Sequence, residues 1–319
     1  MTDRQPVAEV RRSVRALLDE VRVDSGHLAV AVSGGADSLA LAAATAQLAD
    51  RRGLTLHGLV VDHRLQADSA DVAARAAKQL HGLGFAEVRV LEVDVRGPGG
   101  PEAAARKARY AALRAAVPAP DALVLLGHTR DDQAETVLLG LGRGSGPRSI
   151  AGMRRLDPPW GRPLLDVPRS VTAAACVELG LDPWQDPHNA DPAYARVRLR
   201  REVLPLLEGV LQGGVAAALA RTAAQLREDA EALDVLADRV LARARSGAAL
   251  EVPELSAEPP AVRRRVLRRW LLGAGVAELT DAHLRAADAL IGEWRGQGGV
   301  WLPGGLEVSR ARGRLTVSG

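Results

Sequence analysis

Cysteine and long apolar runs are almost missing from this chain of 319 residues. Cys176 is the only cysteine, so the chain can form no internal disulfide and no CxxC redox, zinc or iron–sulfur cluster. No apolar run approaches the roughly 18 residues that a membrane-spanning helix needs, and residues 1–22 are charged and amphipathic, unlike a signal peptide. We therefore expect a cytoplasmic protein without a membrane segment.

Lysine is nearly as scarce as cysteine. Among the 42 basic residues only Lys78 and Lys107 are lysines, so the basic pI of 9.6 comes almost wholly from arginine. Arginine stays charged at physiological pH and can bind phosphate through two parallel hydrogen bonds. The net charge is only +3, however, and an arginine preference also arises from genome composition. Composition alone therefore leaves nucleic-acid binding open.

Apolar segments alternate with helical segments over the first part of the chain. Short, nearly uniform apolar runs predict strands, and the alanine-rich stretches between them predict helices. Such alternation is typical of a parallel sheet covered on both faces, so we predict an α/β doubly wound domain that binds its ligands beyond the carboxyl ends of the strands. The predicted strands are 28–32, 54–61, 88–93 and 122–126, and the predicted helices are 7–21, 38–50, 68–83 and 101–116.

The pattern changes beyond about residue 145, where glycine- and proline-rich segments replace the regular alternation. An apolar residue then recurs every seven positions from Leu219 to Val240, which predicts one long helix over 213–245, packed within its own chain rather than in a dimeric coiled coil. Helices near 262–272 and 281–291, followed by short strands, predict a small α+β unit. The predicted division is a catalytic domain over 1–210, a helical connector over 211–249 and an α+β domain over 250–319.

A glycine turn directly follows the first predicted strand, and a helix is predicted from about Asp37. Glycines let the backbone turn with its amides exposed, and a helix amino end adds partial positive charge, so the turn can hold a polyphosphate. Asp37 is suited to a Mg²⁺ ion that bridges phosphates, whereas a plain capped turn is the simpler alternative. The chain has no Gly-Lys pair, which argues against a P-loop NTPase. The glycine turn consists of Ser33, Gly34, Gly35, Ala36, Asp37 and Ser38.

The glycine turn and six later segments resemble one enzyme family. The turn is similar to the pyrophosphate loop of the N-type ATP pyrophosphatases, which split ATP into AMP and pyrophosphate. Within that superfamily the later segments look like tRNA(Ile)-lysidine synthase, and this match covers most of the first 210 residues. The end of the chain, with Leu302-Pro303-Gly304-Gly305, is similar to that family's first carboxyl-terminal domain. The six segments are 61–65 with Ser69, 105–110, 128–136, 143–146, 162–165 and 184–207.

The resemblance implies a ligase that modifies the isoleucine tRNA with a CAU anticodon. Such an enzyme adenylates the wobble cytidine with release of pyrophosphate, and free L-lysine then displaces AMP to give lysidine. ATP is thus the expected substrate, Mg²⁺ the expected cofactor and tRNA the expected partner, while the sequence leaves the oligomeric state open. The alternatives are another tRNA-modifying enzyme of the superfamily, although a thiolase needs reactive cysteines, and a non-catalytic module that binds ATP and RNA.

Candidate site residues follow the second and fourth strands. On a helix that begins near Asp131, Asp132 and Glu135 share a face and can hold Mg²⁺ or the ammonium groups of lysine. Arg106 and Arg109 can pair on the nucleotide or the activated intermediate, or be ordinary solvated charges. Capping is an equal alternative for Asp62, and His128 taken alone is more often structural. The catalytic candidates are Asp37, Arg109, Asp132 and Glu135, and the ATP-binding candidates are the glycine turn with Asp62, His63, Arg106 and His128.

Two arginine-rich segments are the predicted tRNA contacts. One follows Tyr194, and the other lies within residues 261–319, which hold ten arginines against five carboxylates. Arginines of this kind can contact tRNA phosphates, and the alternative is a solvated helix face. The tRNA-binding candidates are Arg196, Arg198, Arg200, Arg201, Arg264 and Arg268.

Overall fold

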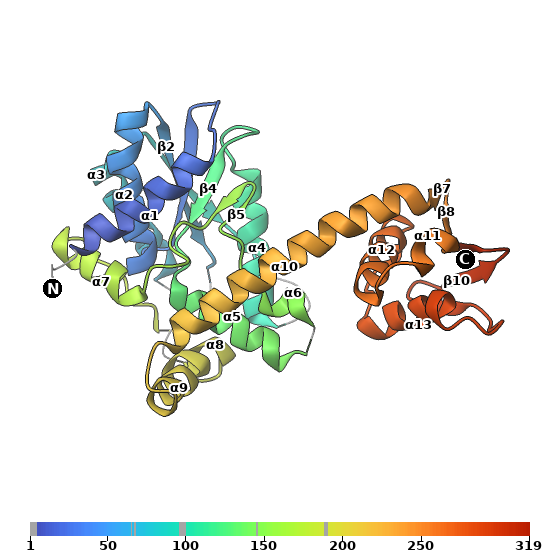
Figure 1. Cartoon of the computed structure of the whole chain (residues 1–319). Coiled ribbons are helices and arrows are strands. Elements are labelled where there is room, and N and C mark those ends of the chain that lie inside the picture. Colours follow the sequence, from blue (N-terminus) through green and yellow to red (C-terminus); the bar gives the residue numbers. More distant parts are fainter. Residues whose placement is uncertain (1–4, 65, 67, 96–99, 145, 188–190) are drawn as a thin grey trace. The chain divides into compact units, whose positions relative to one another are not determined.

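The computed structural model describes the chain apart from residues 1–4, 65, 67, 96–99, 145 and 188–190 (Figure 1). Leu65, Ser145 and residues 188–190, which belong to the segments of family resemblance, lie outside the described residues. The chain divides into two compact units. Unit 1 consists of residues 1–142 and 152–223, and unit 2 consists of residues 143–151 and 224–319.

A parallel sheet forms the centre of unit 1. Its middle strand β1 (His27–Val32) pairs in parallel with β2 (Thr55–Asp62) on one side and with β4 (Leu123–Leu126) on the other. Next to β2 lies β3 (Glu87–Glu92), also parallel. These strands agree with the predicted ones to within one or two residues. The prediction of an α/β doubly wound domain is confirmed.

The sheet continues beyond β4 with two strands of two residues each. β6 (Trp160–Gly161) is parallel to β4, and β5 (Leu156–Asp157) is antiparallel to β6, which gives the order β3-β2-β1-β4-β6-β5. Neither strand was expected, because two residues are too few to show a periodic pattern.

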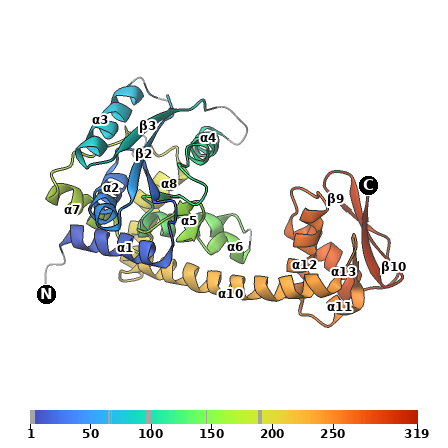
Figure 2. The same cartoon turned by 90° about the horizontal axis from the view of Figure 1, so that it is seen from above.

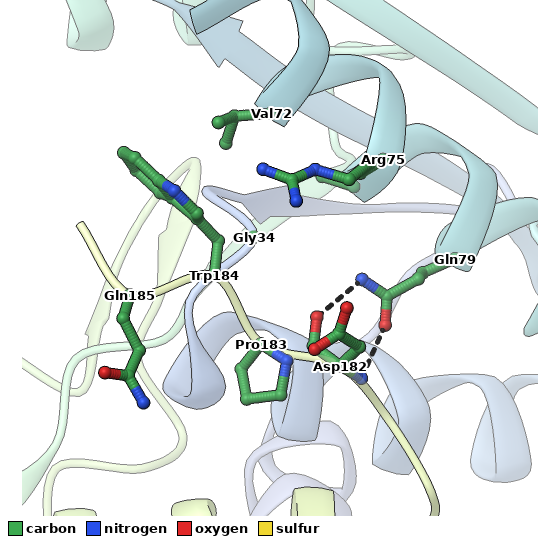
Figure 3. Close-up of a pocket in the computed structure, with 9 residues that line it drawn as sticks. Gly34, Val72, Arg75, Gln79, Asp182, Pro183, Trp184 and Gln185 are labelled. Carbon is green, nitrogen blue, oxygen red and sulfur yellow. Dashed lines mark hydrogen bonds between the residues drawn. The ribbon is translucent and has the colours of Figure 1, made fainter. Parts of the chain in front are cut away.

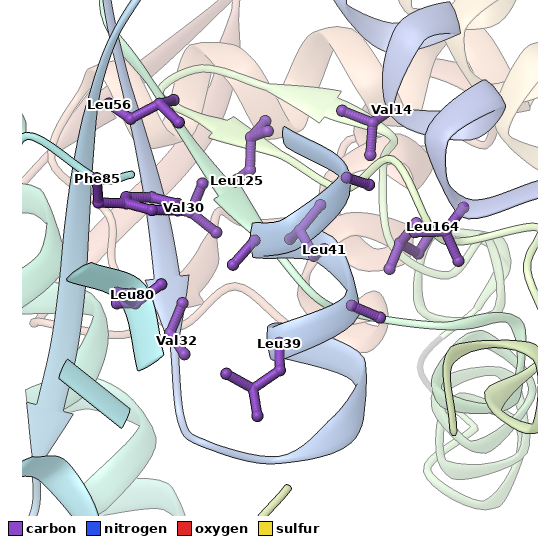
Figure 4. Packing of buried hydrophobic residues seen from close by; sticks show 14 of the residues in the cluster. Val14, Val30, Val32, Leu39, Leu41, Leu56, Leu80, Phe85, Leu125 and Leu164 are labelled. Carbon is purple, nitrogen blue, oxygen red and sulfur yellow. The ribbon is translucent and has the colours of Figure 1, made fainter. Parts of the chain in front are cut away.

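Helices cover both faces of the sheet (Figure 2). Successive side chains of a strand point to opposite faces, so Leu28, Val30 and Val32 pack against one helical layer and Ala29 against the other. Figure 4 shows the first of these cores, with Leu41 and Val14 among its buried side chains. The first layer contains α1 (Pro6–Glu20), α2 (Ala36–Ala49), α3 (Ser69–Gly82) and α7 (Arg169–Glu178), and the second contains α4 (Pro101–Ala115).

The central helix α2 is buried on nearly all sides, from Ser38 to Thr45. A helix that is apolar all round lies in the interior of a domain. Its amino end therefore has a fixed position at the carboxyl end of β1, where the glycine turn joins the two elements.

The remaining helices of unit 1 lie near the carboxyl end of β4 or follow α7. The helix α5 (Arg130–Gly142) begins four residues after β4, and a short helix α8 (Ala195–Arg198) continues into a π-helical turn η3 (Leu199–Val203) and then into α9 (Leu204–Val210). A π-helical turn shifts the side chains that follow it and often occurs at functional sites.

Unit 2 contains a five-stranded antiparallel sheet and a group of helices, which confirms the predicted α+β fold. The sheet order is β7-β8-β11-β10-β9, and its inner face packs Leu250, Val308 and Leu315 against the buried side chains of the helices. The strands are β7 (Arg245–Ser246), β8 (Ala249–Glu251), β9 (Val300–Leu302), β10 (Leu306–Ala311) and β11 (Arg314–Ser318). The helices are α6 (Pro147–Ile150), α11 (Val252–Ser256), α12 (Pro260–Gly273) and α13 (Asp281–Gly292).

The long helix predicted over 213–245 is present as α10 (Val215–Ala244). Leu219 packs with Ala134 and Leu204 of unit 1, whereas Leu233 and Val240 pack in the core of unit 2. These members of the seven-residue repeat therefore contact their own chain. Within the described part of the chain no single helix is long and apolar enough to cross a membrane, and one sharply bent pair, Ala195–Val210 with Val215–Ala244, reaches the required length and composition only together.

A close approach of β4 to α2 generates a first prediction. Gly127 directly follows β4, and a Cβ atom there would come within 3.0 Å of backbone atoms of Asp37 and Ser38. Backbone in a buried helix cannot move aside, so Gly127→Ala should lower the free energy of unfolding by about 1–3 kcal/mol. Chemical unfolding measures this difference.

The matched control is Gly82→Ala at the end of α3, where a Cβ atom would meet nothing within 4 Å. This variant should be neutral or more stable by up to about 1 kcal/mol, because alanine favours a helix over glycine. Equal stability of the two variants would contradict the close approach.

Candidate functional site

The glycine turn lies at the carboxyl end of β1 and leads straight into α2. Gly34 has a φ of 84°, which favours glycine, and Gly35 caps α2 without offering a side chain to its first-turn amides. The Ser38 hydroxyl donates to the Gly35 carbonyl at 2.9 Å and accepts from the Ser33 amide at 3.2 Å. The turn is therefore closed by its own hydrogen bonds, and the α2 amino end above it is suited to an anion.

A small pocket lies beside Gly34, on the side of α3 (Figure 3). The Trp184 amide donates to the Gly34 carbonyl at 2.9 Å, and the Gln79 side chain exchanges two hydrogen bonds with the backbone of Asp182. The pocket encloses about 130 Å³, well below the roughly 300–1,000 Å³ of small-molecule sites. We assign it to support of the glycine turn and not to the nucleotide.

The three predicted acidic residues, Asp37, Asp132 and Glu135, converge at the carboxyl ends of β1 and β4; we call them the acid cluster. A guanidinium that the sequence analysis did not single out, that of Arg169, contacts all three. Its Nε lies 3.2 Å from Asp37 Oδ2, its Nη2 lies 2.6 Å from Asp132 Oδ1, and its Nη1 lies 3.6 Å from Glu135 Oε1. One cation therefore bridges carboxylates from α2 and α5.

Further donors contact the other carboxylate oxygens of the acid cluster. Thr172 donates its hydroxyl to Asp37 Oδ1, and Thr129 donates both its amide and its hydroxyl to Asp132 Oδ2, at 2.8 and 3.0 Å. Glu135 is fully buried, and Arg200 from η3 donates to both of its oxygens, at 2.7 and 3.2 Å. Every oxygen of the acid cluster is thus paired within the chain.

Burial and the neighbouring cations act against each other on the acid cluster. Burial raises the pKa of Asp37 above its usual value, although Arg169 opposes the rise. Burial also acts to raise the pKa of Asp132, but Arg169 and His128 outweigh it and the net shift is downward. The pKa of Arg169 rises despite burial because Asp132, Asp37 and Glu135 surround it. The acid cluster is therefore neutralised internally.

The position of Arg169 follows from the way α5 and α7 begin. The Arg169 amide donates to Asp131 Oδ2 at 2.8 Å, and the Arg130 amide donates to the Val167 carbonyl at 3.0 Å. Asp131 therefore fastens the start of α7 and does not point into the acid cluster. One signal was present in the sequence, because Arg169 is the only lysine or arginine between Pro163 and Tyr194.

A second group, which we call the cation cluster, contains the arginines Arg106, Arg109 and Arg162, with the neutral imidazole of His128 beside them. The arginines lie around Tyr110, whose hydroxyl lies 3.5 Å from Arg106 Nη2, while the guanidinium carbons of Arg106 and Arg109 lie 4.8 and 5.5 Å from its ring centre. Burial acts to raise the pKa of Tyr110, but Arg106, Arg162 and Arg109 lower it overall. Arg162 is buried and was quoted in the sequence analysis only as part of a motif.

Several buried nitrogen atoms of this region have no hydrogen-bond partner among the described residues. They include Arg109 Nε, His128 Nδ1 and His63 Nδ1. Burial lowers the pKa of Arg109 and of His63, and each also feels the positive charge of a neighbouring arginine. Unpaired buried donors amid excess positive charge indicate a site for an anionic ligand. Asp62, by contrast, accepts from the Arg64 amide at 2.9 Å in a local turn, whereas the residue that caps the next helix, α3, is Asp68.

The arginine side chains that follow Tyr194 have different partners. Arg200 binds Glu135, and Arg196 Nη1 lies 3.8 Å from the same carboxylate. Arg198 pairs with Glu202 on the exposed surface at 3.0 Å, and Arg201 is also exposed. Arg196 and Arg200, which were predicted to contact tRNA, thus lie against the acid cluster. The tRNA contacts of the four arginines stay predictions.

In unit 2 most arginines of α12 are held in ion pairs. Arg263 binds Asp288 at 2.7 Å, while Arg265 and Arg269 lie 3.1 and 3.4 Å from Asp234. Arg264 and Arg268, the two predicted tRNA contacts of this helix, have no ion pair with a described residue. They are four positions apart and therefore share one face of α12.

Asp37 is the predicted Mg²⁺ ligand, and its surroundings fit this role in donor type. Within the described ranges no group of three or more His, Cys, Asp or Glu side chains is arranged to hold a metal ion by itself. Mg²⁺ bound to nucleotides usually takes only one or two carboxylates, with phosphate oxygens and water as its other ligands. A single carboxylate beside a phosphate-binding turn is therefore a suitable donor.

Two protein families match this chain. The PP-loop domain matches residues 6–207, and the TilS substrate binding domain matches residues 250–316. Among curated proteins, the tRNA(Ile)-lysidine synthase of Rhodococcus erythropolis is 59% identical over 91% of this chain and 89% of its own length. That of Mycobacterium leprae is 56% identical over 99% of this chain and 98% of its own length.

A solved structure, that of a U34-tRNA thiolase from Methanococcus maripaludis with its [4Fe-4S] cluster, has a similar fold. The TM-score is 0.59, at 20% sequence identity, over 70% of this chain and 80% of the thiolase. At this identity the likeness extends to the fold alone.

His128 provides a prediction of pH dependence. Burial lowers its pKa far below 6.5, and Arg109 adds to the fall although Asp132 opposes it. As the pH falls below about 6.5, the unfolded chain gains a proton at His128 that the folded chain does not, so the folded state loses stability. Between pH 6.5 and 4.5, His128→Gln should therefore lose less stability than the wild type, by up to about 1.4 kcal/mol per pH unit.

Chemical unfolding at the two pH values measures the difference. His81→Gln is the control, because the His81 side chain is exposed at the end of α3, and its pH dependence should match the wild type. The assignment fails if His128→Gln and the wild type lose the same stability.

Proposed function

The chain belongs to the tRNA(Ile)-lysidine synthase family, and from this premise we propose that it uses ATP to ligate free lysine to the wobble cytidine of the isoleucine tRNA with a CAU anticodon. The observation that supports this most directly is the arrangement of opposite charges at the strand ends. A cation cluster with unpaired donors suits an adenylate, and an acid cluster close to it suits a cationic amino acid. The reaction takes place in the cytoplasm.

Adenylation of the cytidine is the first step. The triphosphate of ATP lies on the glycine turn, at the amino end of α2, while Asp62 and His63 contact the adenine or ribose. The carbonyl oxygen of the cytosine attacks the α-phosphorus, the bond to the bridging oxygen breaks, and pyrophosphate leaves. Arg106 and Arg109 with His128 stabilise the charge that develops on the α-phosphate, and Arg162 holds Tyr110 beside them.

Asp37 would hold Mg²⁺, which would supply positive charge to the departing pyrophosphate. In this structure the Asp37 carboxylate accepts from Thr172 and Arg169, and each of its oxygens keeps a further lone pair for the ion. The first-turn amides of α2 contribute further positive potential at the same place.

Displacement of AMP is the second step. Asp132 and Glu135 bind the positive charge of lysine, which orients its side-chain amine toward the activated carbon. The amine, once it has lost a proton, forms the new carbon–nitrogen bond. The carbon–oxygen bond breaks, and AMP leaves with the oxygen atom. The two clusters thus serve the two halves of the reaction.

The alternative functions fit the site less well. A thiolase needs an accessible thiolate, whereas burial and the nearby Asp37 raise the pKa of Cys176 to about 11. A non-catalytic ATP- and RNA-binding module has no need for three clustered carboxylates beside its nucleotide. If the acid cluster bound a ligand other than lysine, the ligase proposal would lose its second substrate.

Radiolabelled lysine tests the proposal. Label should enter an isoleucine tRNA with a CAU anticodon only when ATP and Mg²⁺ are both present, with one AMP released for each lysine attached. Asp132→Asn should reduce the rate by at least about 100-fold, because the lysine loses its counter-charge. Glu20→Gln, which removes an exposed carboxylate paired with Arg155 at 2.8 Å, is the matched control and should keep the rate.

Each alternative function gives a different result in the same assay. A folded protein that binds ATP and tRNA yet leaves the RNA unlabelled is the non-catalytic module. Release of pyrophosphate that depends on a sulfur donor instead of lysine identifies a thiolase.

The two arginines of α12 without an ion pair to a described residue give a further prediction. In the double variant Arg264→Gln/Arg268→Gln, tRNA affinity should fall, and the slope of log affinity against log salt should become shallower by about one for each phosphate that the variant no longer binds. Filter binding over a range of salt measures both quantities. Arg285→Gln, which removes an exposed arginine paired with Asp281, is the control. An unchanged slope in the double variant would remove Arg264 and Arg268 from the tRNA surface.

A further inference from the structure

Arg169 occupies the position that the proposed function assigns to the lysine substrate. Its Nη2 and Nη1 lie 2.6 Å from Asp132 and 3.6 Å from Glu135, so its guanidinium stands between the two carboxylates. An ammonium group bound by the same carboxylates needs the same space and the same oxygen atoms. Arg169 and lysine therefore compete for Asp132 and Glu135.

The charge of the acid cluster adds to this competition. Its three carboxylates are matched by Arg169, Arg200 and Arg196, all within 3.8 Å of a carboxylate oxygen. A further cation entering this set gains little attraction and meets repulsion from three guanidinium groups. With these partners in place, the acid cluster is a poor site for lysine.

A bound triphosphate would give Arg169 another partner. Its Nε already lies 3.2 Å from Asp37, which belongs to the glycine turn, so phosphates on that turn come within reach of the guanidinium. Phosphate carries more charge than a carboxylate and accepts two parallel hydrogen bonds from arginine. Nucleotide in the turn therefore draws Arg169 away from Asp132 and Glu135.

The backbone of Arg169 stays in place during such a movement. Its amide donates to Asp131 at 2.8 Å, and its carbonyl accepts from the Thr172 hydroxyl at 2.8 Å. The side chain, by contrast, is about a quarter exposed and has rotatable bonds on which to swing. The change is confined to one side chain, and α7 does not need to move.

We propose that Arg169 is a positioning residue that makes lysine binding depend on bound ATP. In the nucleotide-free protein it holds the lysine position, and with ATP in the glycine turn it moves to the phosphates and leaves Asp132 and Glu135 to lysine. The two substrates then bind in order, ATP before lysine. This inference rests on the proposed function, since it takes lysine as the second substrate.

Calorimetric titration of the wild-type protein with lysine tests the proposal without any substitution. The titration is done with Mg²⁺ alone and with Mg²⁺ plus saturating α,β-methylene-ATP, which cannot release pyrophosphate. Lysine affinity should rise by at least about 10-fold with the nucleotide, and lysine should raise nucleotide affinity by the same factor, because coupling between two sites is reciprocal. Equal lysine affinity in both titrations overturns the proposal.

Two variants separate the proposed role from a merely structural one. Arg169→Met removes the competing cation, so nucleotide-free protein should bind lysine more tightly than the wild type, and the coupling factor should fall to within about 3-fold of one. Arg169→Lys keeps the charge, which protects the fold, but an ammonium cannot span three carboxylates, so the coupling should also fall. Weaker lysine binding in both nucleotide states, with coupling retained, would show that Arg169 only supports the acid cluster.

Arg52→Met is the matched control. It removes an arginine whose partners, Asp19 and the Leu18 carbonyl, do not belong to the acid cluster, and it should leave the coupling factor at its wild-type value. If Arg169→Met does not fold, the wild-type titration and Arg169→Lys still decide the outcome.

The labelling experiment separates failure of this proposal from failure of the proposed function. A chain that attaches lysine to tRNA but binds lysine equally well with and without nucleotide keeps its function and loses this inference. A chain that binds no lysine in either state and labels no tRNA loses both.

Discussion

The contact of Arg169 with three carboxylates is the constraint on which the site depends. Asp37 lies in the first turn of α2, Asp132 and Glu135 lie in the first two turns of α5, and Glu135 is fully buried. Like charges that share one cation destabilise one another, and burial adds a desolvation penalty of several kcal/mol for each ion. The guanidinium of Arg169 offsets part of this penalty because its planar fork reaches all three carboxylates at once.

The acid cluster and the cation cluster differ in how their charges are paired, and this difference has a chemical consequence. In the acid cluster each carboxylate has an internal partner, so a substrate must exchange with a group of the protein. In the cation cluster Arg109 and His128 keep buried nitrogens that no described residue pairs, so a substrate can be added without displacing anything. An anionic nucleotide therefore meets a preformed site, whereas a cationic amino acid meets an occupied one. This asymmetry alone favours nucleotide as the first substrate to bind.

The sequence predicted those features that depend on local pattern. The parallel strands, the glycine turn and the helical face shared by Asp132 and Glu135 each follow from periodicity or from neighbouring residues. Features that depend on distant parts of the chain were not predicted. Arg169 reaches the acid cluster only because α7 begins beside α5, and the one signal in its segment is that it is the only lysine or arginine between Pro163 and Tyr194. Arg200 joins Glu135 through a π-helical turn, whose position no periodic pattern reveals.

The abundance of arginine has a structural meaning that composition could not disclose. In unit 2, Asp234 forms ion pairs with Arg148, Arg265 and Arg269, and Asp288 forms one with Arg263. Most of the positive charge on α12 is therefore paired within the unit. Around the acid cluster, Arg169 and Arg200 serve as internal counter-ions. The excess of basic residues is thus a poor measure of the surface that could contact RNA. The arginines that have no ion pair with a described residue, such as Arg264 and Arg268, are a better guide to such a surface.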